Sequence, residues 1–408
     1  MIDEAGLRWL AARGRRESPF HLLPVGRGPV IAVHPEHVAQ VLRDRPEDFV
    51  KSGDEGMRGA AGSFRLFGAF RDVTGGTLGG DVGATWRRRR GPVVEALRAH
   101  AHGLDPDVIV AAVRAAVAPE IEARPQAVDL HALARRVAAR LFLASLLGPE
   151  GPRVPGAVAS LLALDEAVNR PWVSPRVAKE TAAAARALLG EEALAAAPSG
   201  SLGALLRARA AAAGASPEWV TDELLAFYLV GGDPIASVLP AALIHVAREP
   251  VDGLPTSGSG ADLLASDVLE ATVRETLRLH PPVWAIGRQA ARATTLGDVA
   301  VREGALVVAL VWATQRHPDY YDRPDAFRPE RFLGAEAARA REALCGFGLG
   351  PRRCPGRSTS FLQLRVALGT MLQVLAVAPT ARVPRPRLGI TLGPAGPVVV
   401  PVRWIASS

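Results

Sequence analysis

Cysteine is almost absent from this chain of 408 residues, which contains only Cys345 and Cys354. Two cysteines cannot supply the disulfide framework of a small secreted domain, and their scarcity indicates a reducing compartment. Cys345 is interpreted most simply as a small core residue. The nine histidines are scattered, without the paired spacing that is typical of a zinc site. The sequence therefore indicates neither a disulfide scaffold nor a zinc site.

Lysine is equally rare, because it occurs only at positions 51 and 179, and all but two of the 48 basic residues are arginine. Together with the abundance of alanine, glycine and proline, this imbalance is typical of a genome with GC-rich codons. The net charge of +7 is therefore weak evidence for a nucleic-acid partner. A basic face could still receive an acidic electron-transfer protein.

Long uninterrupted apolar runs are also missing, since none approaches the ~18 residues that span a membrane. The first residues, Met1 to Ala5, are acidic and do not resemble a targeting segment. Apolar residues make up 49% of the chain, which is enough for a large core. No repeat or linker divides the sequence. We therefore expect a soluble, cytoplasmic protein in which residues 1–408 form one domain.

Local patterns predict short strands and a helix near the start, followed by a helical middle. The alanine-rich residues 107–213 are predicted to be helical, with breaks near prolines. Ser216 and Pro217 are typical of a capped helix start, and a long apolar helix follows them. The other predicted elements are strands at 22–25, 29–33, 283–288, 299–301 and 305–311, and a helix at 35–42.

What the chain does contain is a glycine-rich, proline-broken loop around Cys354, at residues 347–357. Three arginines, Arg352, Arg353 and Arg357, flank the cysteine, and an amphipathic helical pattern follows it. A helix N-terminus and guanidinium groups both favour a thiolate over a thiol. A thiolate in such a frame is suited to be an axial ligand of haem iron. The alternative is a buried core cysteine, which does not need a frame of glycine and arginine.

The pattern Phe-x-x-Gly-x-x-x-Cys-x-Gly, formed by Phe347, Gly350, Cys354 and Gly356, resembles the haem-binding loop of the cytochrome P450 family. This resemblance implies a mainly α fold with small β-sheets. It also implies that haem b lies between a long central helix and the helix after the cysteine loop. Cys354 would ligate the iron, and Phe347, Gly348 and Gly356 would line the cofactor.

Four arginines follow Trp86, and their interpretation depends on spacing. Trp86 and Arg90 are four residues apart and share one helix face. The resemblance implies that they bind the haem propionates together with Arg288 and Arg352. We expect the intervening residues 87–89 to be exposed to solvent. Nucleic-acid binding through residues 87–90 is the poorer alternative.

The predicted long helix contains the main departure from the family. The resemblance places Gly231 and Gly232 over the haem, where relatives carry an acid and an alcohol that guide protons to oxygen. In this chain Pro234 and Ile235 stand at those positions. Asp233 is one position away and points roughly 100° aside. A central proline is also expected to kink the helix. The catalytic segment 231–235 is therefore atypical.

Other site residues are implied by order along the chain. Glu-x-x-Arg occurs five times, but only Glu275 and Arg278 precede the cysteine loop in the family's arrangement. With Arg331 they would form a structural ion network. Residues 51–84 contain ten glycines and predict a long loop, which the resemblance places over the substrate. The expected pocket residues are Phe67, Val230, Val283, Trp284 and Ile286, with residues 169–172 in the pocket roof.

The resulting prediction is a bacterial-type haem-thiolate monooxygenase acting on a small or mid-sized, largely apolar molecule in secondary metabolism. A ferredoxin or flavodoxin would donate electrons, and the protein would be a monomer without a membrane or nucleic-acid partner. Because the acid and alcohol are missing, three alternatives stay open. The enzyme is peroxide-driven, its substrate assists proton delivery, or it catalyses oxidative coupling, rearrangement or dehydration without inserting oxygen. A non-enzymatic haem or gas sensor is the more remote alternative.

Overall fold

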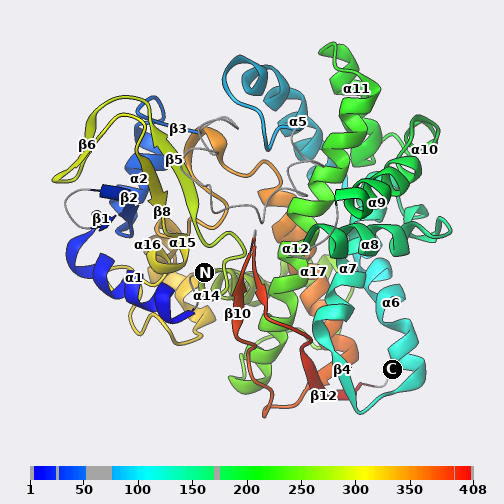
Figure 1. Ribbon diagram of the computed structural model, residues 1–408. Coiled ribbons are helices and arrows are strands. Elements are labelled where there is room, and N and C mark those ends of the chain that lie inside the picture. The colour runs from blue at the N-terminus through cyan, green and yellow to red at the C-terminus, as the bar shows by residue number, and fades with distance from the viewer. Residues whose placement is uncertain (1–3, 24–26, 52–75, 170–174, 390, 406–408) are drawn as a thin grey trace. The chain divides into compact units, whose positions relative to one another are not determined.

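The computed structural model describes residues 4–23, 27–51, 76–169, 175–389 and 391–405, and it is mainly helical with small sheets (Figure 1). This confirms the predicted fold class. Two compact units can be distinguished. The sheet unit comprises Met1–Phe64, Arg274–Cys354 and Arg385–Gly393, and the helical unit comprises Arg65–Val273, Pro355–Pro384 and Pro394–Ser408. The assignment of one domain to residues 1–408 stays a prediction.

The sheet unit is built on a five-stranded sheet in the order β1-β2-β8-β5-β3. Its strands are β1 (Phe20–Leu23), β2 (Arg27–Ala32), β3 (Phe49–Val50), β5 (Ile286–Ala290) and β8 (Leu306–Ala309). Strand β2 pairs in parallel with β8, whereas β1–β2 and β5–β8 are antiparallel. Val30 and Val307, which are partners in the parallel pair, are both fully buried and form part of the core. The helices and helical turns of this unit are α1 (Glu4–Glu17), α2 (Pro35–Ala39), η1 (Gln40–Asp44), α15 (Val311–Thr314), η4 (Pro329–Phe332), η5 (Gly334–Glu336), α16 (Ala337–Glu342) and η6 (Gly350–Arg352).

Three predicted elements differ from the structure in this unit. The helix predicted at 35–42 changes at Gln40 into the wider π-helical turn η1. The strand predicted at 283–288 begins only at Ile286, since the tryptophan before it turns inward: Trp284 donates its indole N–H to the carbonyl oxygen of Gly389 at 3.2 Å. The strand predicted at 305–311 is shorter, because β8 ends at Ala309 and α15 begins at Val311. β7 (Val299–Val301) pairs with β6 (Thr294–Leu296) across a two-residue Gly-Asp turn, which the sequence reading missed.

The helical unit is organised around α12 (Pro217–Arg248), which packs against α7 (Leu130–Leu147) and α17 (Arg357–Val374). The predicted cap is present, because the Ser216 hydroxyl accepts the Trp219 N–H at 3.3 Å. The other helices and the turn η3 are α5 (Gly83–Gly103), α6 (Pro106–Ala123), η3 (Gly151–Arg153), α8 (Ala157–Asn169), α9 (Pro175–Leu188), α10 (Glu191–Ala196), α11 (Leu202–Ala212) and α13 (Gly260–Ala265). Helix α14 (Asp267–Leu279) is shared between the units. Strands β4 (Ala127–Asp129), β12 (Val399–Trp404) and β9 (Leu375–Val377) form a three-stranded sheet in that order. Strands β10 (Pro386–Leu388) and β11 (Leu392–Pro394) form a separate two-stranded sheet.

Helix α12 continues through two prolines, Pro234 and Pro240. Because proline lacks a backbone N–H, the carbonyl groups four residues earlier, at Val230 and Ala236, lose their helical donors. The helix is long and apolar enough to cross a membrane by length and composition, but 72% of its most apolar window is buried inside the structure. That burial is what a core helix of a folded protein shows, so length and composition here are weak evidence for a membrane span.

Candidate functional site

The cysteine loop has a backbone that only glycine allows at two positions. Gly348 and Gly350 adopt φ angles of +70° and +67°, which are unfavourable for residues with a Cβ. At Gly350 a Cβ would also lie 2.3 Å from the carbonyl oxygen of Leu42. The loop closes where the Cys354 N–H donates to the carbonyl oxygen of Phe347 at 2.8 Å. Cys354 is therefore held in place by backbone geometry.

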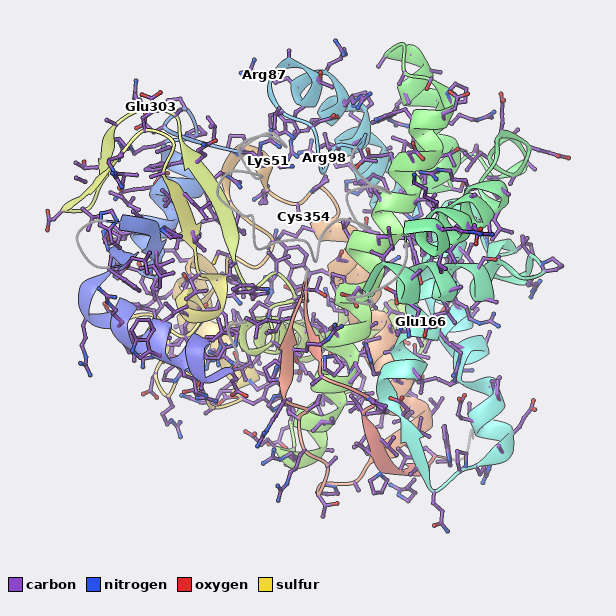
Figure 2. All side chains as sticks on the ribbon, viewed as in Figure 1. Lys51, Arg87, Arg98, Glu166, Glu303 and Cys354 are labelled. Carbon is purple, nitrogen blue, oxygen red and sulfur yellow. The ribbon has the colours of Figure 1, made fainter. Side chains whose placement is uncertain are left out.

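The two cysteines lie in different environments. Cys345 is only 1% exposed, and burial raises the pKa of its thiol to about 12. That thiol stays protonated and inaccessible, as expected of a core residue. Cys354 is partly exposed and lies three residues before the first residue of α17 (Figure 2). Of the two, only Cys354 can present its sulfur to a ligand.

A buried ion network lies in the sheet unit with this loop. The carboxylate of Glu275 accepts two hydrogen bonds from the guanidinium of Arg278, both at 2.7 Å, and one from Arg331 at 3.3 Å. None of the three side chains is more than 3% exposed. Arg278 also donates to the carbonyl oxygens of Gln315, Pro324 and Ala326. The structure thus brings together the three residues that were expected to form a structural network, and it satisfies the buried charges.

Gln315 connects this network to the base of the cysteine loop, and sequence reasoning missed it. Its Oε1 accepts the N–H groups of Cys345 and Gly346 at 3.0 and 2.8 Å. Its Nε2 donates to the carbonyl oxygens of Leu277 and Arg278 at 3.0 and 3.1 Å. The side chain is fully buried, so all four bonds are formed away from water. No sequence motif marks this glutamine, which stands three residues after a tryptophan at the start of a helix.

Arg288 and Arg352 form a positively charged pair in the sheet unit. Burial, with a smaller contribution from the positive charge of Arg352, lowers the pKa of Arg288 to about 10. Arg288 donates to the carbonyl oxygen of Gly287 at 2.8 Å, and within the part of the chain that the structure describes no carboxylate forms an ion pair with it. A buried guanidinium beside a second positive charge favours a nearby anion. This arrangement fits a carboxylate of a bound cofactor.

Helix α5 positions Trp86 and Arg90 on one face, where the Arg90 guanidinium lies 5.2 Å from the centre of the Trp86 ring. Arg87 and Arg88 are exposed, as expected (Figure 2). The expectation for Arg89 is wrong, because Arg89 is partly buried. It binds the Asp81 carboxylate at 3.0 Å, and its guanidinium lies over the Trp219 ring. Arg89 is partly buried because α5 packs against the segment that contains Asp81 and against Trp219 of α12.

The atypical segment of α12 presents an open face. Val230 is 49% exposed, and a Cβ placed on Gly231 would have no atom within 4 Å. Ile235 is 6% exposed, so this hydrocarbon side chain is buried. The negative charge of Asp233 contributes, after burial and Asp165, to raising the pKa of the Tyr228 phenol. The expected offset of Asp233 from Pro234 stays a prediction.

The expected pocket residues have different surroundings. Val283 is 38% exposed, and Ile286 is partly buried at the start of β5. Trp284 packs on the core beside α1 and is anchored by its indole N–H, so its freedom to contact a substrate is limited. Phe67 and residues 170–172 lie outside the described residues, as does the side chain of Asn169.

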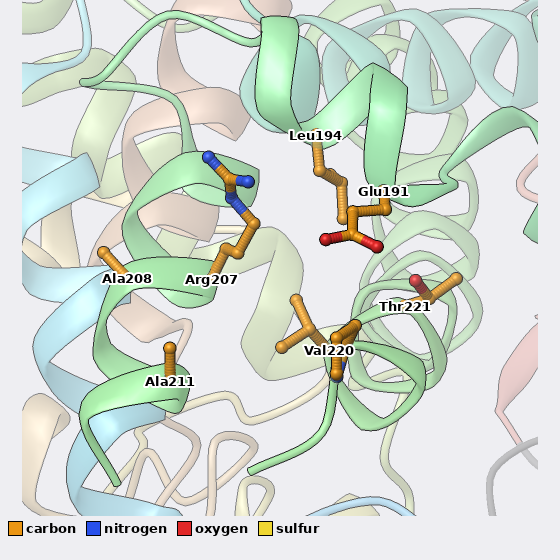
Figure 3. A pocket seen from close by; sticks show the side chains of 8 residues that line it. Glu191, Leu194, Arg207, Ala208, Ala211, Val220 and Thr221 are labelled. Carbon is orange, nitrogen blue, oxygen red and sulfur yellow. The ribbon is translucent and has the colours of Figure 1, made fainter. Parts of the chain in front are cut away.

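One cavity of about 290 Å³ lies elsewhere in the helical unit, between α10, α11 and the start of α12 (Figure 3). Glu191 and Arg207 project into it, and its apolar lining includes Leu194 and Val220. It contains neither Cys354 nor any of the expected pocket residues. We therefore do not assign the candidate site to this cavity.

Comparisons with known proteins agree with the geometry of the cysteine loop. Residues 261–397, which include the Glu275 network and Cys354, match the family model Cytochrome P450. This part of the chain is similar to the cytochrome P450 family. Proteins of that family contain a haem cofactor whose iron is bound through cysteine.

Cytochrome P450 relatives with curated names match only part of this chain. A 2-hydroxyisoflavanone synthase of Glycyrrhiza uralensis is 32% identical over 176 residues, which are 38% of this chain and 34% of that protein. The mitochondrial 25-hydroxyvitamin D-1 alpha hydroxylase of Rattus norvegicus is 33% identical over 174 residues, or 39% and 34% of the two chains. The chain thus spans about a third of the length of the curated relatives it matches.

Solved cytochrome P450 structures resemble the whole fold. A 6-coordinated cytochrome P450 from Thermus thermophilus superposes with a TM-score of 0.71 and 23% identity, covering 97% of this chain and 98% of that one. A zebra fish cytochrome P450 studied with progesterone reaches a TM-score of 0.78 at 18% identity, covering 97% and 99%. At these identities the likeness establishes the fold of the cytochrome P450 family.

The residues present fit a haem. Within the sheet unit, Cys354 offers an accessible sulfur, and the glycines at 348 and 350 keep bulk away from it. Arg288 and Arg352 provide positive charge for an anionic group. These features belong to this chain's own structure and agree with what the similarity to the cytochrome P450 family implies.

Proposed function

We propose that this protein is a haem-thiolate monooxygenase that oxidises a small or mid-sized, largely apolar molecule, in bacterial secondary metabolism. The observation that carries the proposal is the contrast between the cysteines. Cys345 is a buried thiol, whereas Cys354 is accessible in a loop whose glycine backbone and buried network leave it little freedom. Such rigid support is required of a residue that ligates a metal.

The haem would be held by Cys354 through its sulfur and by four side chains that suit its propionates, namely Trp86, Arg90, Arg288 and Arg352. Phe347, Gly348 and Gly356 would line it. When bound, the haem supplies oxygen activation with electrons from a redox partner. The arginines neutralise its acidic groups, and the glycines let the backbone approach it closely. The role of Glu275, Arg278 and Arg331 is indirect, since they keep the cysteine loop in place.

Proton delivery is where this chain departs from a typical family member. Pro234 has no backbone N–H, and Ile235 has no hydroxyl, so neither can donate a proton or anchor a water. The proton must then come from the substrate or from ordered water. The second candidate function follows from the same observation: a peroxide-driven reaction, or coupling, rearrangement or dehydration without oxygen insertion, would not need the missing pair.

For partners and location, the proposal includes a ferredoxin or flavodoxin as electron donor and a monomeric, cytoplasmic protein. The exposed Arg87 and Arg88 of α5 support an acidic partner, because complementary charge steers association. A nucleic-acid role for this arginine run is not supported, since Arg89 is already bound to Asp81 and Trp219.

The decisive experiment replaces each cysteine in turn. With carbon monoxide, the reduced wild-type protein is expected to show the red-shifted Soret band of a thiolate-ligated haem. Cys354→Ser should lose this band, whereas Cys345→Ala, which removes a buried thiol without adding a polar group, should keep it. If Cys354→Ser retains the band, Cys354 is not the ligand and the proposal fails.

A further inference from the structure

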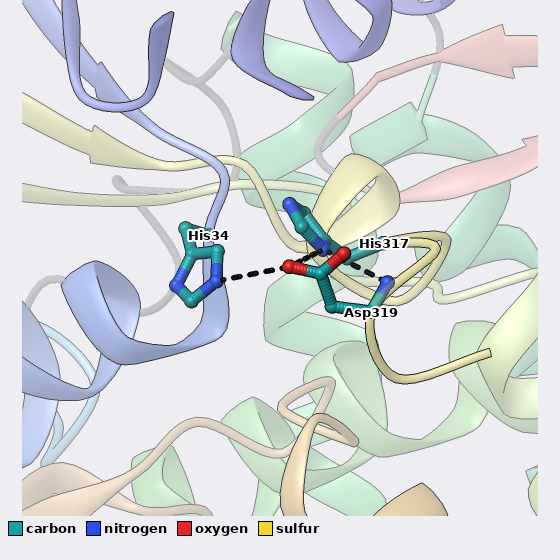
Figure 4. Close-up of side chains that lie close together, drawn as sticks. All are labelled: His34, His317 and Asp319. Atoms are coloured by element: carbon teal, nitrogen blue, oxygen red, sulfur yellow. Dashed lines mark hydrogen bonds and ion pairs between the residues drawn. The ribbon is translucent and has the colours of Figure 1, made fainter. Parts of the chain in front are cut away.

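Three metal-binding side chains meet in the sheet unit, at a place that the haem chemistry does not use (Figure 4). His34 immediately precedes α2, and His317 and Asp319 follow α15. The Asp319 Oδ2 atom lies 3.7 Å from His34 Nε2 and 3.7 Å from His317 Nδ1. All three ligand atoms lie within 4.8 Å of one another. Sequence spacing could not show this cluster, because its members come from opposite parts of the chain.

These distances are close to those of a metal site. Nitrogen and oxygen ligands at 2.0–2.2 Å from a tetrahedral zinc ion lie roughly 3.3–3.5 Å apart. The observed separations from Asp319 therefore exceed that spacing by only a few tenths of an ångström. The Asp319 side chain is 62% exposed and free to adjust, whereas the His317 ring is 5% exposed and fixed by packing. The two rings also touch, with centroids 4.7 Å apart at an edge-to-face angle of 82°.

Metal binding would replace the backbone hydrogen bonds that the two rings now accept. The Asp319 N–H approaches His317 Nδ1 at 3.4 Å, so this nitrogen carries a lone pair, which the metal would take over from the N–H. His34 Nδ1 accepts the Glu36 N–H at 3.3 Å, which leaves the proton on Nε2. Metal binding at Nε2 requires that proton to move to Nδ1. The Glu36 carboxylate lies 4.0 Å from Nδ1. It is placed to accept a hydrogen bond from Nδ1–H, in the way that carboxylates support metal-bound histidines.

We propose that His34, His317 and Asp319 form a binding site for a first-row transition-metal dication such as Zn²⁺, with water as the fourth ligand. Two imidazole nitrogens and one carboxylate oxygen suit Zn²⁺, whereas Mg²⁺ and Ca²⁺ prefer oxygen ligands alone. The bound ion would clamp the start of α2 to the segment after α15, and so fasten two parts of the chain that are distant in sequence.

The local charge limits the affinity of this site. The positive charge of Arg15 is near enough to His317 to contribute to lowering the pKa of that ring, and Arg339 donates to the carbonyl oxygen of Asp319. Both guanidinium groups oppose a dication. We therefore expect micromolar affinity and a stabilising role, without participation in the haem chemistry.

The test is a calorimetric titration of the untagged, haem-loaded protein with Zn²⁺, together with its thermal midpoint in excess Zn²⁺ and in chelator. Wild type should bind one equivalent at this site and melt at a higher temperature with Zn²⁺. Asp319→Asn, at an exposed position that should not disturb folding, should lose at least about tenfold in affinity and its thermal shift. His34→Gln should behave in the same way.

Two control variants make the result specific. Asp322→Asn changes an exposed carboxylate on the same segment, and His21→Gln changes another histidine of the sheet unit that is outside the cluster. Both should bind Zn²⁺ and shift like wild type. The proposal is overturned if wild type binds no Zn²⁺, or if Asp319→Asn and His34→Gln bind it as tightly as wild type does.

Discussion

Glu223 accepts the backbone N–H of Leu78 at 2.7 Å through a carboxylate that is almost completely buried in the helical unit. The contact ties α12 to the turn that precedes α5. Burial raises the pKa of Glu223 to about 7, and the negative charges of Asp81 and Asp222 add to this, while the Leu78 N–H and Arg89 oppose it. The group therefore changes its charge close to neutral pH.

The first prediction concerns the pH dependence of stability. Because the pKa of Glu223 is higher in the folded than in the unfolded state, the folded protein holds more protons between pH 4.5 and about 7. Stability should then fall as pH rises through this window, by up to about 3 kcal/mol from this group. Glu223→Gln keeps an acceptor for Leu78 and should flatten the dependence. The measurement is the denaturation midpoint of the haem-loaded protein at pH 5, 6, 7 and 8.

The matched control for that experiment is Asp222→Asn. Asp222 neighbours Glu223 in sequence but is partly exposed and paired with Arg186 at 2.6 Å. Its replacement should shift the midpoint by a similar amount at each pH and change the slope only slightly, because the Asp222 charge makes the smallest of these contributions to the raised pKa of Glu223. A Glu223→Gln variant whose stability falls with pH as steeply as that of wild type would show that another group is responsible.

The second prediction concerns Gln315. Gln315→Ala removes the partner of four buried backbone groups, and each buried group without a partner costs about 1–3 kcal/mol. We expect a loss of roughly 3 kcal/mol or more in unfolding free energy, and faster haem loss, because the base of the cysteine loop is released. Denaturation and haem transfer to an apo-globin acceptor measure the two effects.

Gln289→Ala is the control for this loss. The Gln289 amide makes one exposed hydrogen bond, at 3.3 Å, to the carbonyl oxygen of Gly304. Its removal should change stability by no more than about 0.5 kcal/mol and leave haem retention unaltered. Equal effects of the two replacements would mean that Gln315 does not support the loop.

The third prediction concerns Ile235. Because Pro234 and Ile235 carry no proton donor, electron transfer without the true substrate should release reduced oxygen species. Ile235→Thr installs a hydroxyl and should lower this leak several-fold, since a positioned donor assists proton transfer. The measurement is peroxide released per electron pair consumed, after folding and haem content have been verified.

Ile235→Val separates the hydroxyl from the loss of volume, because valine has nearly the shape of threonine without its polar group. The leak of this variant should match that of wild type. If Ile235→Thr and Ile235→Val leak equally, the missing alcohol has no part in proton delivery, and the reactions that insert no oxygen become the better explanation.

Sequence and structure agree where the signal is local. The helix cap at Ser216, the positive-φ glycines of the cysteine loop and the spacing of Trp86 and Arg90 all depend on residues a few positions apart. The Glu275 network joins residues that are further apart along the chain, and it could be anticipated only through resemblance to a family. Errors arose where remote contacts set the end of an element: the strand predicted at 283–288 begins only at Ile286, because the Trp284 side chain is bound to Gly389.

By itself the sequence determined the helical pattern, the cysteine that can act as a ligand, and the absence of an acid and an alcohol at positions 234 and 235. These follow from residue chemistry and from the 3.6-residue and two-residue periods of regular structure. Only the tertiary structure decided that Gln315 binds the base of the cysteine loop, that Arg89 is bound to Asp81, and that His34 meets His317. Such contacts join residues whose separation along the chain carries no periodic signal, so they are set by how whole elements pack.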